Sequence, residues 1–247
     1  MILSNLQFNQ SANISDGFEC SQDQILLSKP SQTNQPFQIL LTASKVSRIR
    51  FCYRSRHKPI NQMTTFISLL RGINVGGHNQ IKMEALRQLY AGLGYAGVQS
   101  YIQSGNVIFN TEETDTHTLE VTISEKIYET FGFKVHVLVI TTDELENTLK
   151  NNPYPADTLK DPEKIYISFL SGAPDRSLLM AIQPSLYAPD EFSLCGKVIY
   201  NYCPNGYGKT KLTNTFFENK LKVTATNRNL KTSIELLKLA EKNQQLI

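Results

Sequence analysis

Lysines that follow a glycine-rich turn mark the stretch of this sequence best suited to hold an anion. The stretch is Pro204-Asn-Gly-Tyr-Gly-Lys-Thr-Lys-Leu212, which follows an expected strand and precedes an expected helix. Free amides at a helix N-terminus favour an anion, and Lys209 and Lys211 would add positive charge. The sequence therefore predicts an anion site formed by Gly206, Gly208, Lys209, Thr210 and Lys211. The alternative is a helix start shaped by its glycines, with both lysines solvated.

The triplet Gly208-Lys209-Thr210 resembles the end of a nucleoside-triphosphate-binding loop. The first glycine of that pattern would fall at Cys203, and no parallel sheet is expected before it. The sequence therefore favours a contact with a phosphate or a nucleotide over hydrolysis of a triphosphate.

Polar residues at strand ends and in one tight turn form a second candidate surface. An arginine at a strand end can clamp a carboxylate or a phosphate with two hydrogen bonds, and amide side chains offer both donors and acceptors. We expect six such residues to contact a ligand: Arg71, Asn74, Gln103, Ser104, Asn106 and Arg228. The alternatives are structural salt bridges for the arginines and an ordinary tight turn at Ser104-Gly105-Asn106.

Other chemistry has little support. The four histidines, at positions 57, 78, 117 and 136, lack metal-binding spacings, and the four cysteines form no CxxC pair. No GxSxG motif or evident Cys-His pair indicates a nucleophile. We therefore name no catalytic residue, metal or cofactor.

The distribution of charge argues against a general nucleic-acid binder. Of the 25 basic and 22 acidic residues, 7 and 3 precede Met63, which leaves 18 against 19 in the remainder. A near-neutral body is not held to phosphate by bulk attraction. No apolar run approaches the length of a membrane span, and the N-terminus lacks the pattern of a signal peptide. We expect a cytoplasmic protein; the sequence indicates no oligomeric state.

Residues 1–62 differ from the rest in composition. They are rich in Gln, Asn and Ser and end in a basic run that includes Phe51 and Tyr53. Such a composition cannot bury enough apolar surface to offset chain entropy. We interpret it as a disordered extension or a non-native upstream stretch, with Met63 as the natural start. A weak targeting or nucleic-acid-binding tail is the alternative.

From Thr64 onward, strand and helix periodicities follow one another in the order β-α-β-β-α-β, twice. The first set consists of a strand at 66–70, a helix at 83–93, hairpin strands at 98–103 and 107–109, a helix at 119–131 and a strand at 133–139. The second set consists of a strand at 165–170, a helix at 175–182, strands at 191–195 and 197–203, a helix at 212–221 and a strand at 223–226. A terminal helix begins at Leu230.

The order is that of the ferredoxin-like, or α-β plait, arrangement, an α+β fold with antiparallel sheets. We expect residues 63–141 to form a first ferredoxin-like domain and residues 142–163 a helix and linker. Residues 164–247 would form a second such domain with the C-terminal helix.

Three motifs are similar to those of the bacterial domain-of-unknown-function 1697 family. They are Leu70-Arg-Gly-Ile-Asn-Val-Gly-Gly77, Tyr101-Ile-Gln-Ser-Gly-Asn-Val107, and Asn205-Gly-Tyr-Gly-Lys-Thr-Lys-Leu-Thr-Asn214 followed by Ala225-Thr-Asn-Arg-Asn229. The resemblance covers residues 63 to 241 and implies two ferredoxin-like halves with no established activity. Lys209 and Thr210 stand where the family usually has Arg and Ser, and Leu230 where an aromatic is usual. Lysine keeps the charge but lacks the planar fork of arginine.

The leading functional hypothesis is an uncharacterised cytoplasmic protein that binds an anionic or nucleotide-like ligand between its two halves. One alternative is an enzyme of unidentified reaction that uses Lys or Arg to stabilise a developing negative charge. Another is an RNA-binding module in which rings on an open sheet face stack on bases. That module would require exposed rings at Tyr101, Phe109, Tyr200 and Tyr202.

Overall fold

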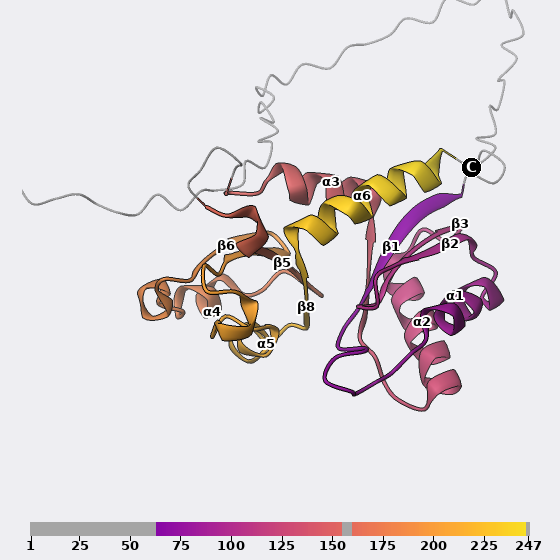
Figure 1. Cartoon of the computed structure of the whole chain (residues 1–247), viewed down its shortest axis with the longest axis horizontal. Coiled ribbons are helices and arrows are strands. Elements are labelled where there is room, and N and C mark those ends of the chain that lie inside the picture. Colours follow the sequence, from indigo (N-terminus) through magenta and orange to yellow (C-terminus); the bar gives the residue numbers. More distant parts are fainter. Residues whose placement is uncertain (1–62, 155–159, 246–247) are drawn as a thin grey trace, which may run out of the picture. The chain divides into compact units, whose positions relative to one another are not determined.

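Four antiparallel strands in the order β2-β3-β1-β4 form the sheet of the first half (Figure 1). The computed structural model describes residues 63–154 and 160–245, so the predictions made for residues 1–62 lie outside the described residues. The elements of the first half are β1 (Thr64–Leu70), α1 (Met83–Gly92), β2 (Ala96–Tyr101), β3 (Asn106–Thr111), α2 (Thr116–Phe131) and β4 (Val137–Thr141).

The second half repeats this order after a connecting helix, α3 (Thr142–Lys150). Its sheet has the order β6-β7-β5-β8, again antiparallel. The elements are β5 (Ile165–Leu170), α4 (Arg176–Met180), β6 (Glu191–Cys195), β7 (Val198–Tyr202), α5 (Asn214–Leu221), β8 (Ala225–Asn229) and α6 (Leu230–Gln244). Short 3-10 helices lie at Pro162–Lys164, Pro184–Tyr187 and Tyr207–Lys209. The two sheets confirm the predicted α+β fold.

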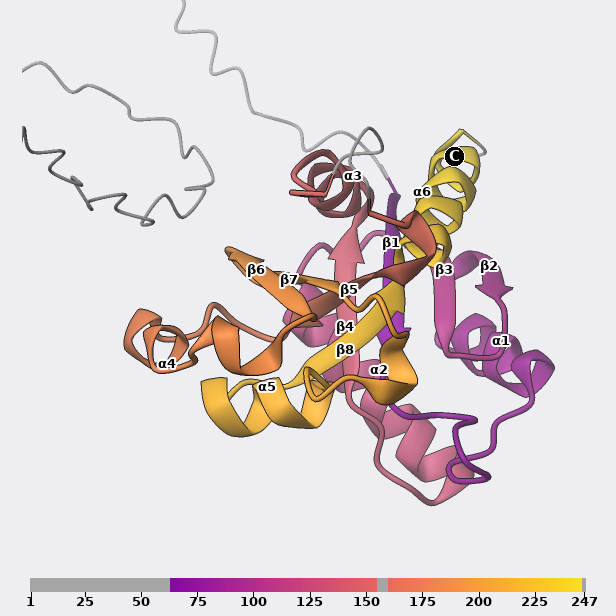
Figure 2. The same ribbon diagram turned by 60° about the vertical axis from the view of Figure 1, so that its left-hand side comes forward.

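Both faces of each sheet are covered. Successive residues of a strand point to opposite faces, so a strand can contribute side chains to two apolar clusters. In β1, Phe66 and Leu70 pack against α1 and α2, whereas Ile67 and Leu69 belong to a second apolar cluster. That second cluster also contains β5 residues and Leu236 of α6. Helix α6 contacts β1 and β3 of one sheet, β5 and β8 of the other, and α3 (Figures 1 and 2). The described residues belong to one compact unit; the domain boundaries expected at 141 and 163 stay a prediction.

The covered sheet faces argue against the RNA-binding alternative, which requires four exposed aromatic rings on an open sheet. Phe109 is fully buried beneath α1 and α2, and Tyr200 is 1% exposed. The hydroxyl of Tyr200 donates to the Thr148 carbonyl at 2.8 Å. Neither ring can stack on a base without opening the core, so the predicted four-ring surface is absent.

Several element ends differ from the predicted ones, for identifiable reasons. Val135 is 2% exposed and packs into the first core from a loop. Its place in the apolar alternation made the predicted strand begin at residue 133, whereas β4 begins at Val137. Leu212 is likewise buried ahead of α5. The Thr213 side chain accepts from the Phe216 amide at 3.2 Å and fixes the helix start at Asn214.

Other termini match the prediction. The Gly132 residue closes α2 in the left-handed conformation, Thr141 and Glu144 form a capping box, and Asn229 caps α6. Among the residues that the structure describes, no helix is both long and apolar enough to cross a membrane.

Candidate functional site

Arg228 is the centre of a buried network that joins the two halves. Its Nε donates to Asn106 Oδ1, from β8 across to β3. Its two terminal nitrogens donate to oxygens of five other residues: Leu70 O (2.8 Å), Ser104 O (3.0 Å), Gly105 O (3.3 Å), Thr226 Oγ1 (3.0 Å) and Asn227 O (2.7 Å). Burial lowers the pKa of Arg228 to about 10. Every N–H group of the guanidinium thus has an acceptor within the protein.

The predicted site residues Ser104, Asn106 and Arg228 therefore do meet, but they bind one another. Asn106 is fully buried, and its Nδ2 donates to the Tyr101 carbonyl at 3.1 Å. The hydrogen bonds of these three residues fasten the hairpin turn of the first half to β8 of the second. In this arrangement the motif residues stabilise the fold and leave no guanidinium donor for a ligand.

Asn74 ties the glycine-rich loop after β1 to the same hairpin turn. Its Nδ2 donates to the carbonyls of Ile81 (3.0 Å) and Gln103 (2.9 Å), and its Oδ1 accepts from the Ile81 amide (2.8 Å). Gln103 itself is exposed. Asn74 and Gln103 line an open cavity of about 650 Å³ beside Met83, the first residue of α1. The two residues that were predicted to share a surface are thus neighbours, although Asn74 already has its hydrogen-bond partners.

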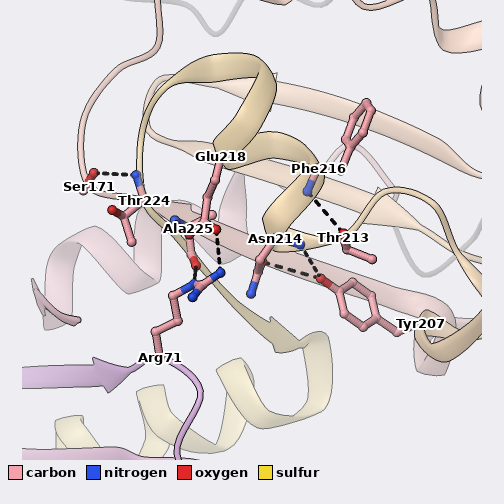
Figure 3. Close-up of polar contacts among 9 residues, drawn as sticks. All are labelled: Arg71, Ser171, Tyr207, Thr213, Asn214, Phe216, Glu218, Thr224 and Ala225. Carbon is pink, nitrogen blue, oxygen red and sulfur yellow. Dashed lines mark hydrogen bonds and ion pairs between the residues drawn. The ribbon is translucent and has the colours of Figure 1, made fainter. Parts of the chain in front are cut away.

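Arg71 reaches from the end of β1 to the second half, as Figure 3 shows. Its Nε donates to the Ala225 carbonyl at 3.0 Å, and its Nη2 pairs with Glu218 Oε2 at 2.5 Å. The other oxygen of Glu218 accepts from the Ala225 amide at 2.9 Å. Arg71 therefore forms the structural salt bridge that was the alternative to a ligand clamp.

Two glutamates accept hydrogen bonds from amides of the edge strands β4 and β8. Glu218 of α5 accepts from the amide of Ala225 in β8, and Glu120 of α2 accepts from the amide of Val139 in β4, both at 2.9 Å. Both strands are edge strands. Burial raises the pKa of Glu120, while the Val139 amide, His117 and Lys197 act in the opposite direction.

The loop predicted to bind an anion forms a 3-10 turn instead of leading directly into a helix. Lys209 and Lys211 are exposed and precede the first residue of α5, Asn214. The Asn214 amide donates to the hydroxyl of Tyr207 at 3.1 Å (Figure 3), which takes up one of the first-turn amides. Thr210 donates to Asp190 Oδ2 at 2.6 Å. The amides of Asn214 and Phe216, which were expected to assist the lysines, thus donate to Tyr207 and Thr213 within the protein.

A cleft between the halves is the better candidate site. It has a volume of about 420 Å³ and is lined by α2, β4 and α3 of one part of the chain and by β5 and the β6–β7 hairpin of the other. Its apolar wall consists of Leu138, Val139, Ile140, Phe169, Leu170, Val198 and Tyr200. Its polar rim includes Thr116, His117, Glu120, Glu144, Asn147, Asn151, Ser171 and Lys197.

None of the residues predicted from the sequence lines this cleft. Its lining comes from six helices and strands and from the loops beside them, and each member has an ordinary local explanation, such as Lys197 in a tight turn after Gly196. The amine of Lys197 makes no hydrogen bond or ion pair with residues 63–154 or 160–245. This lysine is therefore an available charge beside an apolar wall, for which the local sequence carries no signal.

Comparisons with known proteins agree with this architecture. A conserved bacterial protein, SP0830 from Streptococcus pneumoniae, has a solved structure that matches with a TM-score of 0.54 and 25% sequence identity. The match covers 72% of this chain and 99% of that one. No protein with a curated description matches the chain. The family described as "Protein of unknown function (DUF1697)" matches residues 63–200, more than half of the sequence. The chain therefore belongs to the DUF1697 family.

Proposed function

We propose that this protein binds a small organic ligand in the cleft between its two halves. The observation that supports the proposal is the composition of the cleft, an apolar wall with a few polar groups at its rim and a volume of about 420 Å³. Small-molecule sites typically combine these features at volumes of about 300–1,000 Å³. Because both halves contribute to the wall, a bound ligand would also strengthen the contact between them.

The nucleotide-like or other anionic ligand that the sequence predicted would pair with Lys197 in this cleft. The opposing charges are Glu120 and Glu144, so the anionic group belongs at the lysine end of the rim. The exposed loop with Lys209 is the rival anion site. The enzyme alternative stays a prediction, which turnover of any ligand found in a screen would test.

Replacement of Lys197 by alanine is expected to weaken binding of an anionic ligand about ten- to a hundredfold, because one charge-assisted hydrogen bond is lost. The full chain would first be screened by thermal shift against nucleotides, phosphates and carboxylates, and calorimetry would then compare the variants. Lys209→Ala is the matched control and should bind as the wild type does. The reverse pattern, with Lys209 important and Lys197 neutral, would assign the anion to the 205–210 loop and contradict the cleft.

A tryptophan placed on the exposed face of α3 should block the cleft directly. Asn147 lines the cleft and is exposed, so Asn147→Trp can enter the cavity without disturbing a core. We expect it to abolish ligand binding at unchanged melting temperature. Asn219→Trp, on the exposed surface of α5, is the control for an added tryptophan. If Asn147→Trp binds the ligand as tightly as the wild type does, the ligand does not bind in this cleft.

A further inference from the structure

The two halves are equivalent residue by residue around the ends of their first strands. Two equivalent backbone hydrogen bonds lie at the ends of β1 and β5. At the end of β1, Leu70 N donates to Gly105 O (2.8 Å) and Arg71 N donates to His136 O (2.9 Å). At the end of β5, Leu170 N donates to Lys197 O (2.9 Å) and Ser171 N donates to Thr224 O (2.9 Å). Leu70 therefore corresponds to Leu170, and the hairpin turn at Gly105 corresponds to the turn at Lys197.

The strand register makes Ile140 the counterpart of Arg228. Ile140 of β4 lies opposite Ile67 of β1, and Arg228 of β8 lies opposite Ile167 of β5. Each residue thus stands at the same place on the edge strand of its half. In one half this position carries a long guanidinium side chain, and in the other it carries a short apolar one.

The cleft is consequently the counterpart of the pocket that Arg228 fills. The guanidinium is held by Leu70 O, Ser104 O, Gly105 O and Asn106 Oδ1. By strand register, the corresponding residues of the second half are Leu170, Gly196, Lys197 and Val198. Leu170, Lys197 and Val198 line the cleft, and so does Ile140.

We propose that the inner end of the cleft binds a flat group with adjacent N–H donors, of the guanidine or amidine type, supplied by the ligand. The backbone carbonyls of Leu170, Gly196 and Lys197 would take the role that their counterparts take toward Arg228. Gly105 O accepts from both the Leu70 amide and Arg228, so the bond from the Leu170 amide to Lys197 O does not exclude a second donor. Val198 lacks the amide oxygen of Asn106, but Glu120 and Glu144 also line the cleft and give it two carboxylates.

This inference rests on the proposed function and names the chemistry of one end of the ligand. The donor-rich group occupies the inner end, and the anionic group of the same molecule faces Lys197 at the rim. A forked planar cation matches carbonyl oxygens in geometry as well as charge, which a compact ammonium does not.

Three small probes test the inference on the full chain: methylguanidinium, methylammonium and methylurea. Methylguanidinium supplies both the charge and the fork, methylammonium the charge alone, and methylurea a neutral planar group. We expect methylguanidinium to bind at least about tenfold more tightly than either of the others. Titrations followed by amide chemical shifts should perturb Leu170, Lys197 and Val198. Equal binding of all three probes, or shifts confined to other residues, would overturn the inference.

A substitution that copies the arrangement at Arg228 provides the second test. Ile140→Arg should fill the cleft from within, remove methylguanidinium binding and keep the fold, whereas Ile140→Met should still bind the probe. If Ile140→Arg folds and binds methylguanidinium as the wild type does, the assignment is wrong; if it fails to fold, the three probes on the wild type decide. A screen hit that perturbs cleft amides while methylguanidinium does not would remove only this inference. The absence of any ligand that perturbs the cleft would remove the proposed function as well.

Discussion

Replacement of Arg228 by methionine is expected to lower the free energy of unfolding by about 3–5 kcal/mol, because several buried acceptors lose their charged donor at once. Methionine keeps most of the length of the side chain but none of its donors. Asn106 Oδ1 and the carbonyls of Leu70 and Ser104 would then lose a partner inside the protein, at about 1–3 kcal/mol for each acceptor left unsatisfied. The relief of the desolvated charge offsets part of that sum.

Urea denaturation of the full chain measures this effect. Arg176→Met is the matched control, since Arg176 is exposed on α4 and its replacement should change stability by less than about 0.5 kcal/mol. Arg228→Lys should fall between the two, because an ammonium keeps the charge but cannot reach the acceptors as a fork does. A loss below about 1 kcal/mol for Arg228→Met would show that the network positions the halves without stabilising them.

A methyl group added at Gly105 should destabilise the protein nearly as much. The residue has a φ of +74°, and a Cβ there would lie 2.6 Å from the Leu70 Cβ and 2.9 Å from two carbons of the Ile73 side chain. The left-handed conformation costs a non-glycine residue about 1–2 kcal/mol, and overpacking of a core typically adds about 1–3 kcal/mol. Gly105→Ala is therefore expected to lower the free energy of unfolding by about 2–5 kcal/mol.

Gly132→Ala separates the two contributions. Gly132 ends α2 with a φ of +80°, and a Cβ there would meet nothing within 4 Å. Its substitution should cost only the conformational part, about 1–2 kcal/mol. Equal losses for the two variants, measured by urea denaturation, would show that β1 and the hairpin turn yield to the added methyl group and would refute the packing argument.

The fold was accessible from the sequence because its local signals agree with one another. The short apolar runs of β1 and β5, the four-residue spacing in α2 and the caps at Thr141 and Asn229 each act over a few neighbouring residues. Where a buried side chain comes from a loop, as at Val135 and Leu212, periodicity makes a predicted element begin before its true start. Those positions pack as core without belonging to a strand or helix.

The candidate site could be predicted only in part. The sequence shows which polar residues follow the strands, but it does not show which groups they bind. The sequence singled out Arg71, Asn106 and Arg228 as polar residues at strand ends and in a turn, and the structure joins Arg228 to Asn106 by a hydrogen bond. It could not show that Glu218 and the carbonyls of the hairpin turn satisfy their donors, because these contacts join residues more than 100 positions apart. The cleft was missed for a related reason, as Ile140 matters there by being shorter than the arginine at the equivalent position.

The carboxylates at the two sheet edges also bear on how separate copies of the chain behave at high concentration. Unpaired amides of edge strands are where proteins join strand to strand into aggregates. A second copy that approached β4 or β8 would first have to displace Glu120 from the Val139 amide or Glu218 from the Ala225 amide. A carboxylate from the helix beside the strand thus hinders strand-to-strand association at one edge of each sheet, at β4 and at β8.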